Sequence, residues 1–112
     1  YMGKLQNKSK SEIAFEAKPK LGLAVSTTKT YWNVIIYVKH PSVQGKENYV
    51  KETLVNPDEI RVSKKDHDVY LFYKKCRNKF LCVIARIKAK SGYIITAYYT
   101  KKIKEGELKW KK

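Results

Sequence analysis

The stretch "FLCVIARIKAKSGYIITAYYT", residues 80–100, decides the fold. It contains two runs of alternating side chains with β-branched and aromatic residues, a pattern typical of β-strands. Only a short turn signal at residues 90–92 separates the two runs, and so short a connection requires an antiparallel hairpin. The run "VYLFYKK", residues 69–75, comes before them and ends at a similar turn signal, residues 77–79. The sequence therefore predicts a three-stranded antiparallel meander.

The alternation also assigns the side chains of this meander to two faces. If the second hairpin is centred near Lys90, Ile84 lies opposite Thr96, and Cys82 lies opposite Tyr98. One face, expected to form the core under the helices, then carries Val83, Ala85, Ile87, Tyr93, Ile95, Ala97 and Tyr99. The other face, expected to be exposed to water, carries Cys82, Ile84, Arg86, Lys88, Ile94, Thr96, Tyr98 and Thr100. For the strand at residues 69–75, both orientations remain open.

The N-terminal half predicts strands and helices that cover this sheet. The segments "IAFEA" (13–17) and "LGLAVSTT" (21–28) alternate like short strands. A helix follows from Lys29 to Lys39, capped by the hydroxyls at residues 27–28 and ended by Pro41. Its inward side chains are predicted to be Tyr31, Val34, Ile35 and Val38.

A second helix is predicted from about Lys46 to Val55, with Val50, Leu54 and Val55 inward and an end at Asn56-Pro57. A chain of 112 residues is one domain by size. We expect a core over residues 12–110, with residues 1–11 flexible. The predicted fold class is α+β, with N-terminal strands and two helices packed on one face of a C-terminal antiparallel sheet of three or more strands.

The charge of the chain indicates a polyanionic partner. Lys and Arg number 25 against 10 Asp and Glu, which gives a net charge of +15. No acidic residue occurs between Asp68 and Glu105, while ten basic residues do. These are Lys74, Lys75, Arg77, Lys79, Arg86, Lys88, Lys90, Lys101, Lys102 and Lys104. Such clustering is the footprint of a nucleic-acid-binding surface, although a generally lysine-rich composition would also produce many lysines.

Several other classes of protein and site are disfavoured. The sequence has no apolar run long enough to span a bilayer and no secretory leader pattern, so we expect a cytoplasmic protein without a membrane partner. Cys76 and Cys82 lack the spacing of a zinc site, and a cross-strand disulfide between them is a minor alternative. Residues 66–68 hold possible metal ligands, but they lie together in a predicted turn. We therefore expect no metal and no cofactor.

Metal-independent RNA cleavage remains compatible with these residues, because it needs only proton-transfer groups and cations or donors around a phosphate. His40, at a helix C-terminus, is the better placed of the two histidines, although it is also a plausible helix cap. Thr96 and Tyr98 can donate hydrogen bonds, and Tyr98 can stack on a base. Arg61, Arg86 and the lysines are candidate phosphate ligands.

Three segments carry a family resemblance: "YWNVIIYVKHP" (31–41), "VKETLVNPDEIRVSKKDHDVYLFYKK" (50–75) and "FLCVIARIKAKSGYIITAYYTKKIKEGELKW" (80–110). Together they resemble small domains grouped with the phage, barnase, EndoU, colicin and RelE-like nuclease superfamily. The resemblance implies an N-terminal helical part on an antiparallel sheet, with substrate on the exposed sheet face. It also implies His40 as acid or base, Thr96 and Tyr98 as phosphate-side groups, and basic residues at Arg61 and Lys74.

The chain departs from the resemblance at residues 33–35, which read Asn-Val-Ile where similar sequences often read Glu-His-Ile. The leading hypothesis is an RNA-binding domain that acts as a metal-independent ribonuclease of toxin or mobile-element type. Its catalytic residues would be His40, Thr96 and Tyr98, and its RNA-binding residues Arg61, Lys74, Arg86, Lys88, Lys101 and Lys102. The alternatives are a nucleic-acid-binding module without turnover and a toxin-like protein bound by an acidic, antitoxin-like partner.

Overall fold

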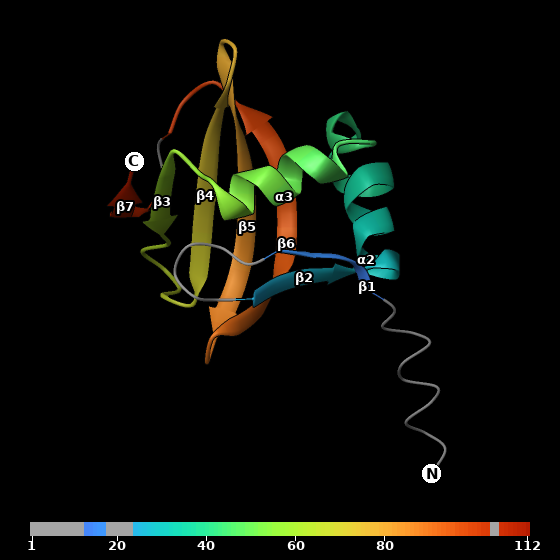
Figure 1. Ribbon diagram of the computed structural model, residues 1–112, viewed down its shortest axis with the longest axis horizontal. Coiled ribbons are helices and arrows are strands. Elements are labelled where there is room, and N and C mark those ends of the chain that lie inside the picture. The colour runs from blue at the N-terminus through green and yellow to red at the C-terminus, as the bar shows by residue number, and fades with distance from the viewer. Residues whose placement is uncertain (1–12, 18–23, 104–105) are drawn as a thin grey trace.

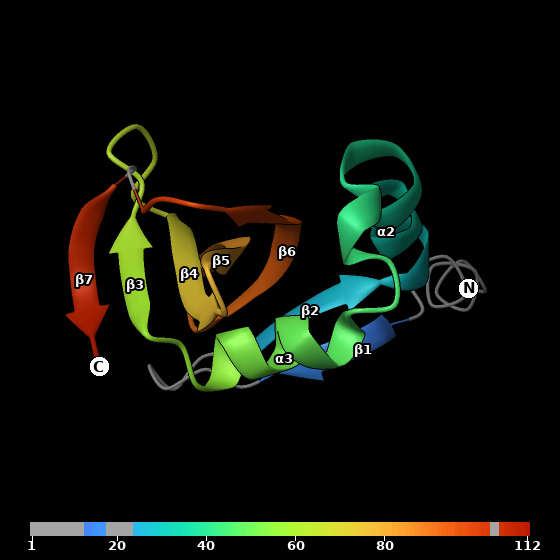
Figure 2. The same ribbon diagram turned by 90° about the horizontal axis from the view of Figure 1, so that it is seen from above.

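The computed structural model describes residues 13–17, 24–103 and 106–112, and these residues form a seven-stranded sheet with helices packed against it (Figures 1 and 2). The strand order is β1-β2-β6-β5-β4-β3-β7, and β2 runs parallel to β6 while the other neighbours are antiparallel. The predicted α+β class is confirmed, but the predicted placement of the N-terminal strands on one face of an antiparallel sheet was wrong: β1 and β2 join the sheet beside β6, and β2 makes the sheet mixed. The predicted flexible segment at residues 1–11 lies outside the described residues. The elements are β1 Ile13–Ala17, β2 Ala24–Thr28, α2 Lys29–Val34, η1 Ile35–Lys39, η2 Pro41–Val43, α3 Glu47–Val55, β3 Glu59–Val62, β4 Val69–Cys76, β5 Lys79–Lys88, β6 Ser91–Thr100 and β7 Glu107–Lys111.

The predicted meander is present as β4, β5 and β6, and its turns are tight. Cys76 pairs with Lys79 across the first turn, and Lys88 pairs with Ser91 across the second. Ile84 lies opposite Thr96 and Cys82 opposite Tyr98, as the alternation predicted. The second turn therefore consists of residues 89–90 and begins one residue earlier than the turn signal in the sequence.

A β-bulge at Ile95 changes the face assignment of the first half of β6. Thr96 pairs with Ile84, but Ile94 pairs with the very next residue, Ala85, so Ile95 is an extra residue in β6. Side chains before the bulge consequently exchange faces. Ile94 is fully buried in the core, and Tyr93 is 51% exposed. The prediction that Tyr93 and Ile95 belong to the core face and Ile94 to the other face was therefore wrong.

The first helix begins where predicted, but it buries a different set of side chains. Thr28 caps it, accepting a hydrogen bond from the backbone N–H of Tyr31. Its second half, η1, is a π-helix, closed by the bond from the His40 N–H to the Ile35 carbonyl at 2.7 Å. The wider π turn rotates the buried face away from a 3.6-residue repeat. The helix therefore buries Trp32, Ile35 and Ile36, whereas Val38, predicted inward, is 74% exposed.

The second helix, α3, lies across one face of the sheet (Figure 2). It buries Val50 and Leu54 as predicted, but Val55 is 42% exposed. The main core lies beneath it and includes Phe72, Val83, Ala85 and Ala97. This settles the orientation of β4, whose Tyr70, Phe72 and Lys74 share the α3 face. None of the helices in the described part of the chain is long and apolar enough to cross a membrane.

We call the opposite face of the sheet the second face. It is partly covered by other residues and is not fully exposed to solvent. Leu71, Tyr73 and Cys82 are buried there, and Ile103 packs against them. Ile103 follows β6 on the way to β7, and three strands separate β6 from β7 in the sheet. Figure 2 shows the chain after β6 running along the side of the sheet opposite α3. The prediction of a water-exposed face was wrong at Cys82 for this reason.

Two strands were not predicted, β3 and β7. Both are short segments in which charged and apolar residues alternate, EIRV and ELKWK, and the sequence analysis assigned no strand to either. β3 pairs with both β4 and β7, and its Ile60 is fully buried. They extend the meander beyond β4, which agrees with the prediction of three or more strands.

Candidate nucleic-acid interface

The structure brings His40 and Tyr98 together on the second face. Their ring centroids lie 5.3 Å apart, and the ring planes are inclined by 31°. Both residues are half-buried. His40 comes from the end of η1 and Tyr98 from β6, so the contact joins two segments far apart in the sequence. An imidazole and a phenol therefore lie together. We call this region, with the candidate residues that lie near Tyr98 in the sequence, the His40 surface (His40, Thr96, Tyr98, Lys101 and Lys102).

The bulge in β6 anchors the helix that carries His40. The Tyr31 hydroxyl donates a hydrogen bond to the carbonyl of Ile95 at 2.6 Å. The Lys39 ammonium donates to the Tyr31 hydroxyl at 2.8 Å and reaches the same carbonyl at 3.4 Å. Because Ile95 is the extra residue of the bulge, its carbonyl is available to groups outside the ladder. This network fixes the position of His40 relative to β6.

Thr96 lies two residues before Tyr98 on the same face. Its Oγ1 is buried and has no hydrogen-bond partner among the residues that the structure describes. A buried hydroxyl without a partner carries a desolvation cost, so a bound group that supplied a partner would be favoured there. A ligand reaches this oxygen only if the groups that cover it move. Thr96 therefore lies on the same face as Tyr98, but in this conformation a ligand has no direct access to its hydroxyl.

Arg61 and Lys74, two predicted phosphate ligands, make internal bonds at a distance from His40. Arg61 pairs with the buried carboxylate of Glu59 and donates to the Gly106 carbonyl at 3.1 Å. Arg61 is on the second face but three strands from Thr96, roughly 14 Å at about 4.8 Å per strand. Lys74 lies on the α3 face, where its ammonium donates to the Asn56 carbonyl at 2.9 Å. Both residues therefore stabilise the β3 end of the sheet.

Arg86 and Lys88 are placed near the other end of β5. Arg86 donates to the Asp66 carboxylate, and Asp68 lies 3.9 Å from its second guanidinium nitrogen. The backbone N–H of Asp68 and, less strongly, Arg86 hold the pKa of Asp66 below its ordinary value against an opposing effect of desolvation. Lys88 is exposed beside the β5–β6 turn. The charge of Arg86 is thus largely neutralised locally.

Lys101 and Lys102 are the predicted cations nearest in sequence to Tyr98, and both are exposed. Thr100, on the same face as Tyr98, donates from its hydroxyl to the Lys102 carbonyl at 3.2 Å. This bond turns the chain at the end of β6. No other predicted basic residue is closer to Tyr98 in the sequence, so these two are the candidates for contact with a polyanion at the His40 surface.

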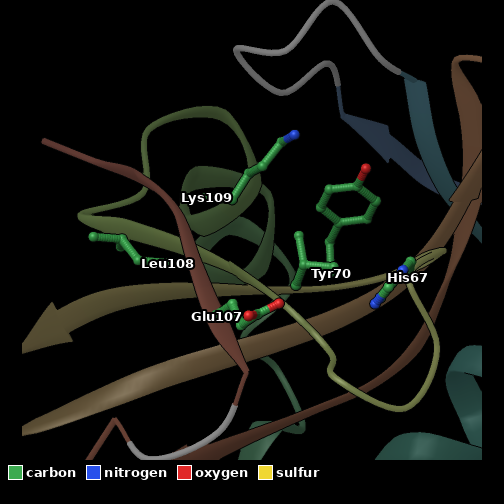
Figure 3. A pocket seen from close by; sticks show the side chains of 6 residues that line it. His67, Tyr70, Glu107, Leu108 and Lys109 are labelled. Atoms are coloured by element: carbon green, nitrogen blue, oxygen red, sulfur yellow. The ribbon is translucent and has the colours of Figure 1, made fainter.

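Two hollows were missed by the sequence analysis. One, of about 410 Å³, is lined by Val62, His67, Tyr70, Glu107, Leu108 and Lys109. Figure 3 shows Tyr70 and Lys109 extending to the same side, with His67 supplied by the β3–β4 loop. His67 follows Asp66, the partner of Arg86, and Arg86 faces Tyr93, five residues along β6 from Tyr98. Tyr93 and Tyr98 lie roughly 16 Å apart along β6, so the two histidines belong to different sites.

The second hollow, of about 560 Å³, lies where the β4–β5 turn meets the start of α3. It is lined by Ser42, Lys46, Tyr49, Cys76, Arg77, Lys79 and Tyr99. Only the run of basic residues after Asp68 hinted at it, because its lining comes from three separate segments. Among the described residues, no three His, Cys, Asp or Glu side chains gather as a metal site would require.

Cys76 and Cys82 are free thiols and do not face each other. Cys82 lies opposite Tyr73, and Cys76 lies opposite Lys79. The two cysteines are on opposite faces of the sheet, so the alternative of a cross-strand disulfide is wrong.

Comparison with known proteins identifies no relative: no family model, no curated protein and no solved structure matches this chain.

Proposed function

We propose that the chain binds RNA at the His40 surface and cleaves it without a metal ion, in a RelE- or barnase-like arrangement of helices and sheet. The observation that carries the proposal is the contact of the His40 ring with Tyr98 at 5.3 Å. It supports a shared site, because a group that exchanges protons lies beside an aromatic ring on which a base can stack. The excess of basic residues, with Lys101 and Lys102 at the end of β6, supports a polyanionic substrate.

The proposed reaction uses the 2′-hydroxyl of RNA as the nucleophile. The O2′–P bond forms and the P–O5′ bond breaks, which leaves a 2′,3′-cyclic phosphate and a 5′-hydroxyl. One proton leaves the 2′-hydroxyl and another must reach the O5′ atom, and His40 performs one of these two transfers. Tyr98 orients the substrate by stacking on a base, and the two lysines hold the flanking phosphates.

The test is cleavage of single-stranded and structured RNA in the presence of EDTA. We expect His40→Ala to lower the rate about 100-fold or more, as loss of a general acid or base does. The matched control is His67→Ala, which removes the other histidine from a separate hollow. It should cleave at the wild-type rate. Absence of EDTA-resistant cleavage, or equal loss in both variants, would remove the catalytic proposal.

A second candidate is an RNA-binding module without turnover. It is favoured by the engagement of Arg61 with Glu59 and of Arg86 with Asp66, because these arginines would otherwise be the natural clamps on a scissile phosphate. In this case wild type and His40→Ala both bind RNA and neither cleaves it. Binding should weaken steeply with salt, and Lys101→Ala with Lys102→Ala should reduce the salt slope by about 2. Affinity independent of ionic strength would remove both candidates.

A further inference from the structure

We propose that the hollow between the β4–β5 turn and the start of α3 binds a nucleoside phosphate, with the phosphate among Lys46, Arg77 and Lys79 and the base against a tyrosine ring. The inference does not depend on cleavage at the His40 surface. The volume of the hollow, about 560 Å³, is in the range of small-molecule sites, about 300 to 1,000 Å³. The nucleotide is either free or one unit of an RNA chain, and the test below separates these two sources.

The charge lining this hollow is of one sign. Lys46, Arg77 and Lys79 contribute to its wall, and of the described residues that line it none is acidic. This differs from Arg61 and Arg86, whose charges are answered by carboxylates. Three cations around a concave surface raise the local concentration of anions, and the planar guanidinium can bind two phosphate oxygens at once.

The lysines of the hollow are held against aromatic rings. The Lys46 ammonium lies 5.3 Å from the centroid of the Tyr49 ring, and the Lys79 ammonium lies 4.4 Å from that of Tyr99. Such cation–π contacts position the ammonium groups beside the hollow and reduce the entropy lost when they bind an anion.

The two tyrosines also suit the rest of a nucleotide. The Tyr49 side chain is 55% exposed, so its ring is open to stacking by a base. Burial, and behind it the neighbouring Cys76 and Tyr49, raise the pKa of the Tyr99 phenol. That phenol therefore keeps its proton near neutral pH and remains a hydrogen-bond donor.

The backbone at Arg77 agrees with a ligand site at this turn. Arg77 is the first of two turn residues and has φ +62°, and Asn78 after it does not share this conformation. A turn of this kind favours glycine at its first position. An arginine there is strained, and strained residues of this sort gather at ligand-binding sites. We infer that the turn presents a guanidinium at the expense of stability.

If Arg77 lowers stability but binds the ligand, replacing it with glycine should stabilise the chain and weaken binding. The probes are AMP, adenosine, inorganic phosphate and a 5′-phosphorylated RNA dinucleotide, titrated into the full chain by isothermal calorimetry. The variant is Arg77→Gly, and its matched control is Lys90→Gly. Lys90 is likewise a cation at positive φ, +71°, but it lies in the β5–β6 turn. Both variants lose one charge and relieve one strained residue.

We expect AMP to bind the wild type at least tenfold more tightly than adenosine or phosphate alone. Arg77→Gly should weaken AMP at least tenfold while raising the melting temperature. Lys90→Gly should raise the melting temperature and leave the affinity within twofold. Tyr49→Leu should weaken AMP but not inorganic phosphate. If the dinucleotide alone binds and Arg77→Gly weakens it, the occupant is a nucleotide of RNA.

Two outcomes would overturn the inference: no saturable binding of AMP or dinucleotide, or equal weakening by Arg77→Gly and Lys90→Gly, which would indicate a general charge effect. His40→Ala separates this inference from the proposed function, because it should leave AMP affinity unchanged. Cleavage of RNA without binding of AMP or the dinucleotide would contradict only the proposed nucleotide site in the hollow. Binding of AMP without cleavage removes only the catalytic proposal.

Discussion

The imidazole of His40 lies against the ring of Tyr98, with 5.3 Å between centroids and 31° between the ring planes. His40 ends a π-helical turn, and Tyr98 follows a β-bulge by three residues. Two irregularities of the backbone therefore meet at this contact. Both kinds of irregularity are frequent at functional sites, because each one re-aims a side chain that regular structure would point elsewhere.

The hydrogen bond from Tyr31 to the bulge is expected to hold His40 in place. Tyr31→Phe removes the bond to the Ile95 carbonyl and the one from Lys39. We expect the free energy of unfolding to fall by about 1 kcal/mol in urea denaturation, and RNA cleavage to fall with it. Tyr37→Phe is the control on the same helix, since Tyr37 is 62% exposed. Equal stability of the two variants would show that the bond does not anchor the helix.

The sequence was sufficient to predict the meander and the pairs Ile84–Thr96 and Cys82–Tyr98, because alternation and turn signals are local properties. The bulge at Ile95 was not predictable from alternation, since "YIITAYY" is apolar on both sides. Either register buries aliphatic groups, and the packing of Tyr31 against the Ile95 carbonyl distinguishes them only in three dimensions.

The site was predictable in part for similar reasons. His40, Thr96 and Tyr98 do share the second face, but Lys74 has the opposite orientation. The roles of Arg61 and Lys74 could not be derived, because no strand was predicted over residues 59–62. Glu59 and Arg61 share a strand face only once these residues are extended, and Gly106 and Asn56 reach Arg61 and Lys74 only in the folded sheet. Sequence patterns show that a cationic side chain is present, but they do not show which hydrogen-bond acceptor it contacts.

Arg61 is expected to contribute mainly to stability. Arg61→Ala leaves the buried Glu59 carboxylate without its guanidinium and removes the bond to Gly106. The free energy of unfolding should fall by about 2 to 3 kcal/mol in urea denaturation. Adding Glu59→Gln should recover part of the loss by removing the uncompensated charge. Lys64→Ala, at an exposed residue, is the control. If Arg61→Ala lowers the free energy of unfolding no more than Lys64→Ala does, Arg61 does not stabilise the fold.

Acid is expected to weaken the link between Asp66 and Arg86. The pKa of Asp66 is lower in the folded chain than its ordinary value of 3.8, so its stabilising effect is complete above that value. The effect is lost as the pH falls through the folded pKa. The melting temperatures of wild type and Asp66→Asn should therefore differ near neutral pH and converge as the pH is lowered from 3.8 through the folded pKa. Glu107→Gln, at an exposed residue outside this ion pair, is the control and should leave the melting temperature at neutral pH close to that of the wild type.

The two thiols are expected to react differently. Cys76 is half-buried, whereas Cys82 is fully buried under Ile103. Ellman's reagent should modify one thiol per native chain rapidly and the second only in denaturant. Cys76→Ser should abolish the rapid phase, and Cys82→Ala should leave it intact. Detection of no thiol in the denatured, unreduced chain would instead indicate a disulfide, contrary to the geometry.

The β5–β6 turn is expected to respond in opposite directions to two kinds of substitution. Ala89 and Lys90 have φ +54° and +71°, values that suit the Asn-Gly pair of a tight hairpin. Ala89→Asn with Lys90→Gly should therefore raise the free energy of unfolding by about 1 to 2 kcal/mol.

Gly92, two residues on, faces the Arg86 carbonyl, which a Cβ would approach to 2.1 Å. Gly92→Ala should lower the melting temperature, because the backbones of β5 and β6 must separate there. Calorimetry on both variants checks the pair, and an unchanged or lower melting temperature for the first would show that the turn does not hold these conformations in solution.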